Sequence, residues 1–156
     1  MPETNWTVRP IGVVSSERTE PVDDDWDRIP ATITLLPPFD ADSILGLDAF
    51  SHLEVVYLFD RVEPGDVHSG ARVPRGNPAW PAVGIFAQRA KNRPNRLGVS
   101  TCELVGISGS TLDVRGLDAI DGTPVLDIKP YLAEFGPRSP VRQPAWSHEL
   151  MAGYFD

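Results

Sequence analysis

Frequent proline is the feature that most restricts how this chain can fold. Sixteen of its 156 residues are proline, about twice the average share. Proline disrupts the interior of a helix and is confined to the edges and ends of strands. Between the prolines the chain consists largely of short runs rich in β-branched and aromatic residues, which favour strands. Long helices are therefore not expected, and short strands separated by turns are.

Seven or so short strands are predicted along the chain. The run from His52 to Phe59 is the most apolar and is the best candidate for a central strand. The turn over residues 108–110 joins two strands as a hairpin. The other predicted strands cover residues 6–14, 31–36, 82–88, 97–107 and 111–115. This pattern is typical of a mainly β fold, namely a small antiparallel β-barrel that is closed or nearly closed.

Two segments depart from the strand pattern. Trp146, Leu150 and Tyr154 recur at four-residue spacing, which predicts an amphipathic C-terminal helix over residues 146–155. We expect the apolar face of this helix to cap the barrel. Residues 61–81 hold four prolines and show the period of neither a helix nor a strand, so a long loop is expected there.

Composition and motifs argue against several classes of site. Cys102 is the only cysteine, so this chain alone builds neither a disulfide framework nor a zinc cluster, and a buried apolar role is expected for it. His52, His68 and His148 lie far apart, and no metal site is expected. The chain has no G-x-G-x-x-G, Walker, H-E-x-x-H or G-x-S-x-G motif. No apolar run approaches the about 18 residues of a membrane span, so we expect one cytoplasmic domain over residues 1–156 with no membrane contact.

Acidic residues are concentrated in the first half of the chain. Residues 1–80 hold six Lys/Arg and 14 Asp/Glu, whereas residues 81–156 hold eight of each, which gives the net charge of −8. Trp26 follows the acidic run Asp23–Asp25, and it either packs in the fold or stacks on a ligand. Because nucleic-acid binders normally show a basic face, a large RNA footprint is not expected. The loop from Arg89 to Arg96, with four cations and no acid, allows a local one.

Two polar phrases, joined by strand-forming residues, hold most of the functional information. The first is QRAKNRPNRLG, from Gln88 to Gly98, and the second is RGLDAIDGTPVLDIKPY, from Arg115 to Tyr131. Glycine and proline fix the backbone of both phrases, and binding residues concentrate in such loops on a rigid scaffold. We therefore expect the two phrases to form two walls of one pocket.

Several phrases of the chain occur in the same order as in a known family. They are PIGVV at 10–14, GLD at 46–48, FSHL at 50–53, RPN at 93–95 with LG at 97–98, LD at 117–118 and DGTPVLDIKPY at 121–131. Over roughly residues 6–135 the chain thereby resembles the TrmO family, in a short form without the C-terminal domain of longer bacterial members. The resemblance implies a small β-barrel that binds S-adenosylmethionine without a Rossmann domain, as a homodimer with a shared site. It also implies methylation of the exocyclic amine of threonylcarbamoyl-adenosine in tRNA.

The two phrases supply the groups that S-adenosylmethionine requires. Its adenine needs backbone hydrogen bonds and apolar contacts, its ribose and amino group need carboxylates, and its own carboxylate needs a cation or a backbone amide. The predicted cofactor-binding residues are Arg89, Arg93, Pro94, Asn95, Leu97, Gly98, Leu117, Asp118, Asp121, Gly122, Thr123, Pro124 and Leu126.

Methyl transfer needs little acid–base help, because the sulfonium is already activated and the protein mainly aligns the reacting atoms. An amine nucleophile must still lose a proton, and the candidate acceptors are His52, Asp127 and bulk water. The structural alternatives are a core histidine and an ion pair between Asp127 and Lys129. The predicted substrate-binding residues are Arg96, Lys91, Lys129, Tyr131 and Trp26.

Three functions remain open at this point. The first is an S-adenosylmethionine-dependent N-methyltransferase acting on modified adenosine in tRNA. The second is a methyltransferase for a small metabolite on the same barrel. It gains weight because the acidic stretch from Asp23 to Asp27 stands where the better-known branch of the family carries a proline–arginine–glutamine phrase. The third is a non-catalytic protein that binds S-adenosylmethionine.

Overall fold

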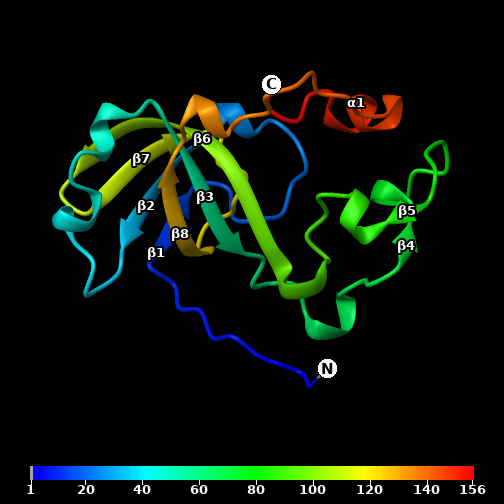
Figure 1. The fold of residues 1–156 in the computed structure, drawn as a ribbon, viewed down its shortest axis with the longest axis horizontal. Helices are drawn as coiled ribbons and strands as arrows, with labels where there is room; N and C mark the ends of the chain where they lie inside the picture. The colour runs from blue at the N-terminus through cyan, green and yellow to red at the C-terminus, as the bar shows by residue number, and fades with distance from the viewer. Residues whose placement is uncertain (1) are drawn as a thin grey trace.

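A closed barrel of six antiparallel strands forms the centre of the computed structural model, which describes residues 2–156 (Figure 1). Around the barrel the order of the strands is β1-β2-β7-β6-β3-β8. Their bounds are β1 Gly12–Ser16, β2 Pro30–Leu35, β3 His52–Leu58, β6 Leu97–Ser108, β7 Thr111–Arg115 and β8 Pro124–Pro130. The predicted mainly β fold, an antiparallel barrel with a C-terminal helix, is confirmed.

The interior of the barrel is defined by alternation along the strands. On β3 the side chains of Leu53, Val55 and Tyr57 are buried, whereas the residues between them face outward. Such a period of two places one side of each strand in the core. The other barrel strands contribute Val14, Ala31, Ile33, Leu35, Cys102, Leu112, Val114 and Val125 to the same core.

Two segments lie outside the barrel wall. The connection from β3 to β6 carries a small two-stranded sheet, β4 (Ala71–Arg72) and β5 (Val83–Gly84). The helix α1 (Ala145–Met151) lies beside this β3–β6 connection, residues 59–96 (Figure 1). Trp80 Nε1, in the connection, donates a hydrogen bond to Glu149 Oε2, in the helix, at 2.7 Å. No helix among residues 2–156 is long and apolar enough to cross a membrane.

Short 3-10 turns complete the described chain. They cover Trp26–Arg28, Ala41–Ile44, Leu47–Ala49, Pro64–Asp66, Pro74–Gly76, Ile85–Ala87, Pro94–Arg96 and Ala133–Phe135. Each occupies a connection between strands or a segment beside one. The barrel strands themselves are interrupted only by register shifts, at Val56/Tyr57 in the pairing of β3 with β8 and at Leu104/Gly106 in the pairing of β6 with β7.

The ends of several elements differ from the prediction. The first strand begins at Gly12 rather than at residue 6, beyond the interruption at Pro10. The predicted strand over residues 82–88 is only β5, because the chain turns into a 3-10 helix directly after it. The C-terminal helix ends at Met151, and Gly153 then adopts a left-handed φ of 78°, a backbone that suits glycine and reverses the chain.

Strand β8 was not predicted, although its residues belong to the second polar phrase. Its two prolines favoured a loop, but they lie at its first and last positions, Pro124 and Pro130. Proline is tolerated at these positions because fewer ladder hydrogen bonds are needed there. Half of the second phrase is therefore barrel wall and only residues 116–123 form a loop.

Candidate functional site

Asp118 lies in the loop between β7 and β8 and accepts hydrogen bonds from two tyrosines. The hydroxyl of Tyr57, near the end of β3, lies 2.9 Å from Asp118 Oδ1 and 3.1 Å from its carbonyl oxygen. The hydroxyl of Tyr154, in the C-terminal segment, donates to Asp118 Oδ2. We call these three residues the Asp118 cluster. One residue from each of three distant parts of the chain thus meets at one end of the barrel.

The electrostatics of the Asp118 cluster keep both phenols protonated. Burial and then the nearby negative charge of Asp118 raise the pKa of Tyr57 and of Tyr154 far above the usual range. The positive charge of Arg89 acts in the opposite direction on both pKa values, which places this guanidinium within electrostatic range of the cluster. The two hydroxyls are therefore hydrogen-bond donors at any physiological pH.

Cys102, on β6, is the other group that responds to Asp118. Its side chain is buried, as predicted, and burial followed by the charge of Asp118 raises the pKa of its thiol to about 12. A thiol with this pKa carries almost no thiolate, which is the nucleophilic form. Cys102 is therefore an inert core residue.

Gly98 determines where the Tyr57 ring can lie. The two residues are opposite each other on β6 and β3, and a Cβ atom on Gly98 would lie 2.5 Å from Cε2 and Cζ of Tyr57. Phe59 holds the same ring from another side, edge to face at a centroid distance of 5.3 Å. The structure thereby joins the two polar phrases across Tyr57, since Gly98 belongs to the first phrase and Asp118 to the second.

Two cations of the first phrase form hydrogen bonds to backbone carbonyls that hold the loop in place. Arg93 Nη1 donates to the carbonyl oxygen of Gln88 at 2.7 Å, and Arg96 Nη1 donates to that of Val62 at 2.7 Å. The sequence did not predict these contacts. Both guanidiniums therefore stabilise the loop. Cofactor binding by Arg93 and substrate binding by Arg96 stay predictions.

The other cations of the first phrase are more available. Arg89 is exposed, and its Nη2 donates to the carbonyl oxygen of Val99 at 2.8 Å, which leaves further N–H groups for a ligand. Lys91 is exposed as well. Pro94 and Asn95 lie in the turn before β6, where Asn95 adopts a left-handed φ of 62°.

The DGT turn of the second phrase is attached to β1. Asp121 Oδ1 accepts a hydrogen bond from the backbone N–H of Ser16 at 3.0 Å, and the N–H of Gly122 donates to the carbonyl of Val14 at 2.8 Å. Gly122 has a left-handed φ of 81°, which glycine adopts at no steric cost. In the structure Asp121 and Gly122 therefore hold the barrel closed next to the Asp118 cluster.

The other residues predicted to contact the cofactor are divided between the core and the barrel wall. Leu117 and Thr123 are buried. Pro124 and Leu126 are half-buried on β8, and Leu97 is exposed at the start of β6. Of these, Leu117 is the direct neighbour of Asp118.

The two predicted proton acceptors lie elsewhere. His52 faces outward at the start of β3, with Nδ1 at 2.7 Å from Ser51 Oγ. It lies five residues before Tyr57, which is roughly 17 Å along a strand. Asp127 Oδ2 lies 2.6 Å from Lys129 Nζ, and this partner raises the pKa of Lys129. The predicted alternative, an ion pair between these two residues, is thus present.

Two predicted substrate residues also have packing partners. Trp26 is buried, its Nε1 donates to the carbonyl oxygen of Asp23 at 3.2 Å, and the guanidinium of Arg18 lies 4.4 Å from its ring centroid. Tyr131 is half-buried just beyond β8, where its backbone N–H donates to the carbonyl of His52 at 2.9 Å. Of the two roles considered for Trp26, packing in the fold or stacking on a ligand, the structure shows packing.

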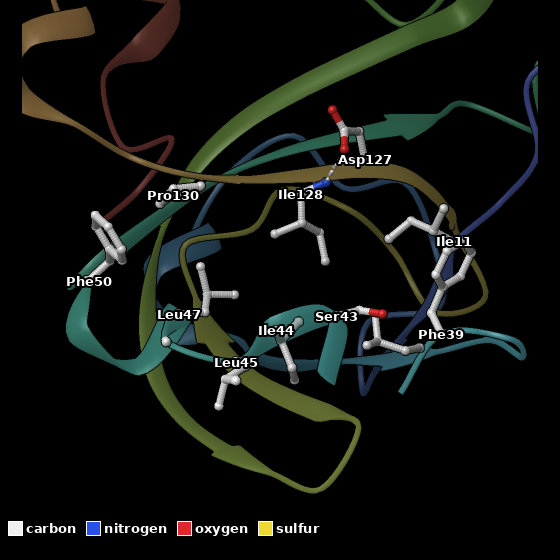
Figure 2. A pocket seen from close by; sticks show the side chains of 12 residues that line it. Ile11, Phe39, Ser43, Ile44, Leu45, Leu47, Phe50, Asp127, Ile128 and Pro130 are labelled. Carbon is white, nitrogen blue, oxygen red and sulfur yellow. Dashed lines mark hydrogen bonds between the residues drawn. The ribbon is translucent and has the colours of Figure 1, made fainter. Parts of the chain in front are cut away.

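A hollow of about 590 Å³ lies at the opposite end of the barrel, between β8 and residues 41–49. Figure 2 shows Ile128 pointing into it, whereas the carboxylate of Asp127 lies on the other side of the strand. Its lining is apolar except for Ser43 and Asp127, and it includes no cation. The hollow suits an apolar group, whereas the Asp118 cluster and Arg89 offer both signs of charge. Within residues 2–156 no group of three or more His, Cys, Asp or Glu side chains could hold a metal ion.

Comparison with known proteins finds a family model that matches most of this chain. The model of the tRNA-methyltransferase O N-terminal domain matches residues 16–136, a span that includes both polar phrases. A crystal structure of TrmO from Pseudomonas aeruginosa superimposes with a TM-score of 0.73 and 32% sequence identity, over 89% of this chain and 61% of that chain.

Curated relatives differ in length from this chain. A probable S-adenosyl-L-methionine-binding protein of Pyrococcus abyssi is 36% identical over 146 residues, which cover 86% of this chain and 72% of the relative. The tRNA (adenine(37)-N6)-methyltransferase of Escherichia coli is 41% identical over 105 residues, which cover 63% of this chain and 43% of the relative. The chain therefore spans most of the archaeal relative and less than half of the bacterial enzyme.

Proposed function

The chain belongs to the family of tRNA-methyltransferase O N-terminal domains, and from this premise we propose that it is an S-adenosylmethionine-dependent N-methyltransferase that acts on modified adenosine in tRNA. Membership confirms the resemblance recognised in the sequence. The observation that carries the proposal is the Asp118 cluster with Arg89 within electrostatic range, because the two combine a carboxylate and a cation inside the matched residues.

The residues of the Asp118 cluster fit the polar groups of S-adenosylmethionine. Each oxygen of Asp118 accepts one phenol hydrogen bond and has a further lone pair for a ribose hydroxyl or an ammonium group. Arg89 keeps free N–H donors for the carboxylate of the cofactor. We assign the cofactor to this end of the barrel and not to the apolar hollow.

When bound, S-adenosylmethionine supplies a methyl group on a positively charged sulfur. The protein has to align that group with the acceptor amine and keep the site dry, because alignment can remove about 7–11 kcal/mol of the barrier. Protonated phenols suit this task, since Tyr57 and Tyr154 bring no negative charge of their own to the sulfur. Because His52 and Asp127 lie away from the Asp118 cluster, we propose bulk water as the proton acceptor, and roles for these two residues stay predictions.

We also propose a homodimer whose second copy closes the site. The support is an apolar strip on the outer face of β3 and β6, made of Val56 and Leu58 beside Val99 and Leu97 in register. Leu97 and Val99 are 41% and 46% exposed. Arg89 donates to the carbonyl of Val99, so a copy packed on this strip would lie next to Arg89, which we assign to the cofactor site.

Light scattering tests the dimer. We expect twice the 17.1 kDa chain mass for the wild type and half that value for Val99→Glu, because a charge at the strip would be buried without a partner. Val105→Glu, on the exposed face farther along β6, is the matched control and should stay dimeric. A wild-type monomer that still transfers methyl groups would contradict a shared site.

The methyl acceptor is either tRNA or a small metabolite, and we propose tRNA. Arg93 and Arg96 donate to backbone carbonyls and Arg89 is assigned to the carboxylate of the cofactor, so Lys91 is the cation of the first phrase most available to tRNA phosphates. The internal use of two cations, together with the net charge of −8, favours a small metabolite as the second candidate acceptor. We also propose that residues 1–156 form one domain. Because tRNA is the proposed acceptor, we propose a cytoplasmic location.

Transfer of a labelled methyl group separates the two acceptors. We expect transfer to tRNA that carries threonylcarbamoyl-adenosine and no transfer to the same tRNA without that modification. Lys91→Ala should weaken tRNA binding and reduce the slope of log affinity against log salt by about 1, with cofactor affinity unchanged. If modified tRNA stays unmethylated at every salt concentration while S-adenosylmethionine binds, the small-metabolite function replaces the tRNA function.

A further inference from the structure

The C-terminal tail, residues 153–156, is hydrogen-bonded to the acidic segment, residues 23–27, which precedes β2. The backbone N–H groups of Asp25, Trp26 and Asp27 donate to the carbonyl oxygens of residues 153, 154 and 155 at 3.1, 2.9 and 3.0 Å. In Figure 1 the red end of the chain returns from α1 to the blue N-terminal third, as these bonds require. This pairing fixes the backbone at Tyr154.

The acidic segment, in turn, contacts two cations. Arg18 Nη1 donates to the carbonyl oxygen of Asp24 at 2.6 Å. Arg75 belongs to the β3–β6 connection. Its Nε lies 3.8 Å from Asp23 Oδ2, and its Nη2 lies 3.4 Å from Asp24 Oδ1. The acidic segment, to which the sequence assigned no structural role, therefore connects the tail to the barrel.

Tyr154 is the tail residue that enters the Asp118 cluster. Its hydroxyl donates to Asp118 Oδ2, opposite the oxygen that Tyr57 occupies. The ring of Phe155 packs edge to face against the Tyr154 ring at a centroid distance of 4.9 Å. Tyr154 also lies beyond residues 16–136, the part of the chain matched by the family model.

We propose that Tyr154 is a positioning residue for the cofactor site, which the C-terminal tail supplies in cis. With one phenol on each carboxylate oxygen, Asp118 is held in a single orientation, and its remaining lone pairs face the ligand. Without the Tyr154 hydroxyl, Oδ2 loses its protein donor and the carboxylate can rotate. The tail thus prepares Asp118 before the ligand arrives, which lowers the cost of binding. This inference rests on the proposed function, because it takes Asp118 as a cofactor ligand.

The variant Tyr154→Phe tests the inference, because it removes the hydroxyl and keeps the ring that packs against Phe155. We expect its Kd and KM for S-adenosylmethionine to rise about tenfold, the size expected for losing a hydrogen bond to a charged group. Its kcat at saturating cofactor should stay within about twofold of wild type. A merely structural role would lower the melting temperature and leave the Kd unchanged.

Trp80→Phe is the matched control. It removes the hydrogen bond from Trp80 to Glu149, which also attaches the C-terminal region, but it does not touch Tyr154. We expect its Kd for S-adenosylmethionine to equal that of wild type. A chain that ends at Ala152 should bind at least as weakly as Tyr154→Phe.

The outcomes separate the inference from the proposed function. If wild type binds and Tyr154→Phe binds equally well or more tightly, the positioning role is overturned while the proposed function stands. If wild type itself does not bind S-adenosylmethionine or S-adenosylhomocysteine, the proposed function is overturned and the positioning role with it.

Discussion

Gly98→Ala is expected to lower the free energy of unfolding by roughly 3 kcal/mol, at the upper end of the usual cost of overpacking a core. The new Cβ would lie 2.5 Å from two ring atoms of Tyr57 and 3.0 Å from Cζ of Phe59. Phe59 packs against the ring, so the ring has little room to withdraw without leaving Asp118. For a chain of this length the expected fall in melting temperature is about 6–12 °C, measured by calorimetry.

Gly84→Ala is the control for this variant. Gly84 has no atom within 4 Å of an added Cβ, and its φ of −60° suits alanine. Its melting temperature should stay within about 2 °C of wild type. Since Gly98→Ala also displaces the Tyr57 hydroxyl, it should weaken S-adenosylmethionine binding, whereas the control should not. Equal melting temperatures for the two variants would contradict the packing described for Tyr57.

Asp118→Asn is expected to weaken S-adenosylmethionine binding at least about 100-fold, the size of losing two hydrogen bonds to a charged acceptor. The amide keeps the shape of the side chain, but it removes the charge and replaces one acceptor by a donor. That donor then faces a phenol hydroxyl, from Tyr57 or from Tyr154. Isothermal titration calorimetry measures the change.

Asp113→Asn, on the exposed face of β7, removes the same charge far from the ligand and is expected to bind like wild type. This control excludes a general effect of net charge. If Asp118→Asn binds within about threefold of wild type, the cofactor site lies elsewhere on the barrel.

The strands were predictable where runs of strand-forming residues are bounded by turn residues. The most apolar run, residues 52–59, identified β3, and the Gly-containing turn after β6 identified the hairpin. β8 was not predictable, because proline at a strand end and proline in a loop give the same local pattern. Only the pairing with β1 and β3 distinguishes them, and this pairing depends on tertiary contacts.

The site was predictable in part. Asp118 was among the predicted cofactor-binding residues, whereas Tyr57 entered the prediction only within an apolar central strand and Tyr154 only on a helix face. Both interpretations describe the rings and miss the hydroxyls, whose partner lies 61 residues from Tyr57 and 36 residues from Tyr154. Arg96 was expected to be free for the acceptor, and its contact with Val62 could not be read from neighbouring residues. Hydrogen bonds between distant segments leave no periodic signal in a sequence.

Thermal denaturation with and without ligand tests the central claim most directly, namely that the Asp118 end of the barrel binds S-adenosylmethionine. A ligand that binds only the folded state stabilises it by about 2.7 kcal/mol at 100 times its Kd. For wild type we therefore expect the melting temperature to rise by about 5–11 °C with S-adenosylmethionine or S-adenosylhomocysteine, and to stay unchanged with NAD or ATP. For Asp118→Asn, whose Kd is expected to be at least about 100-fold higher, we expect a rise of less than about 2 °C at the same concentrations. A wild type whose melting temperature does not change with either adenosyl compound, at concentrations far above micromolar, would contradict the account.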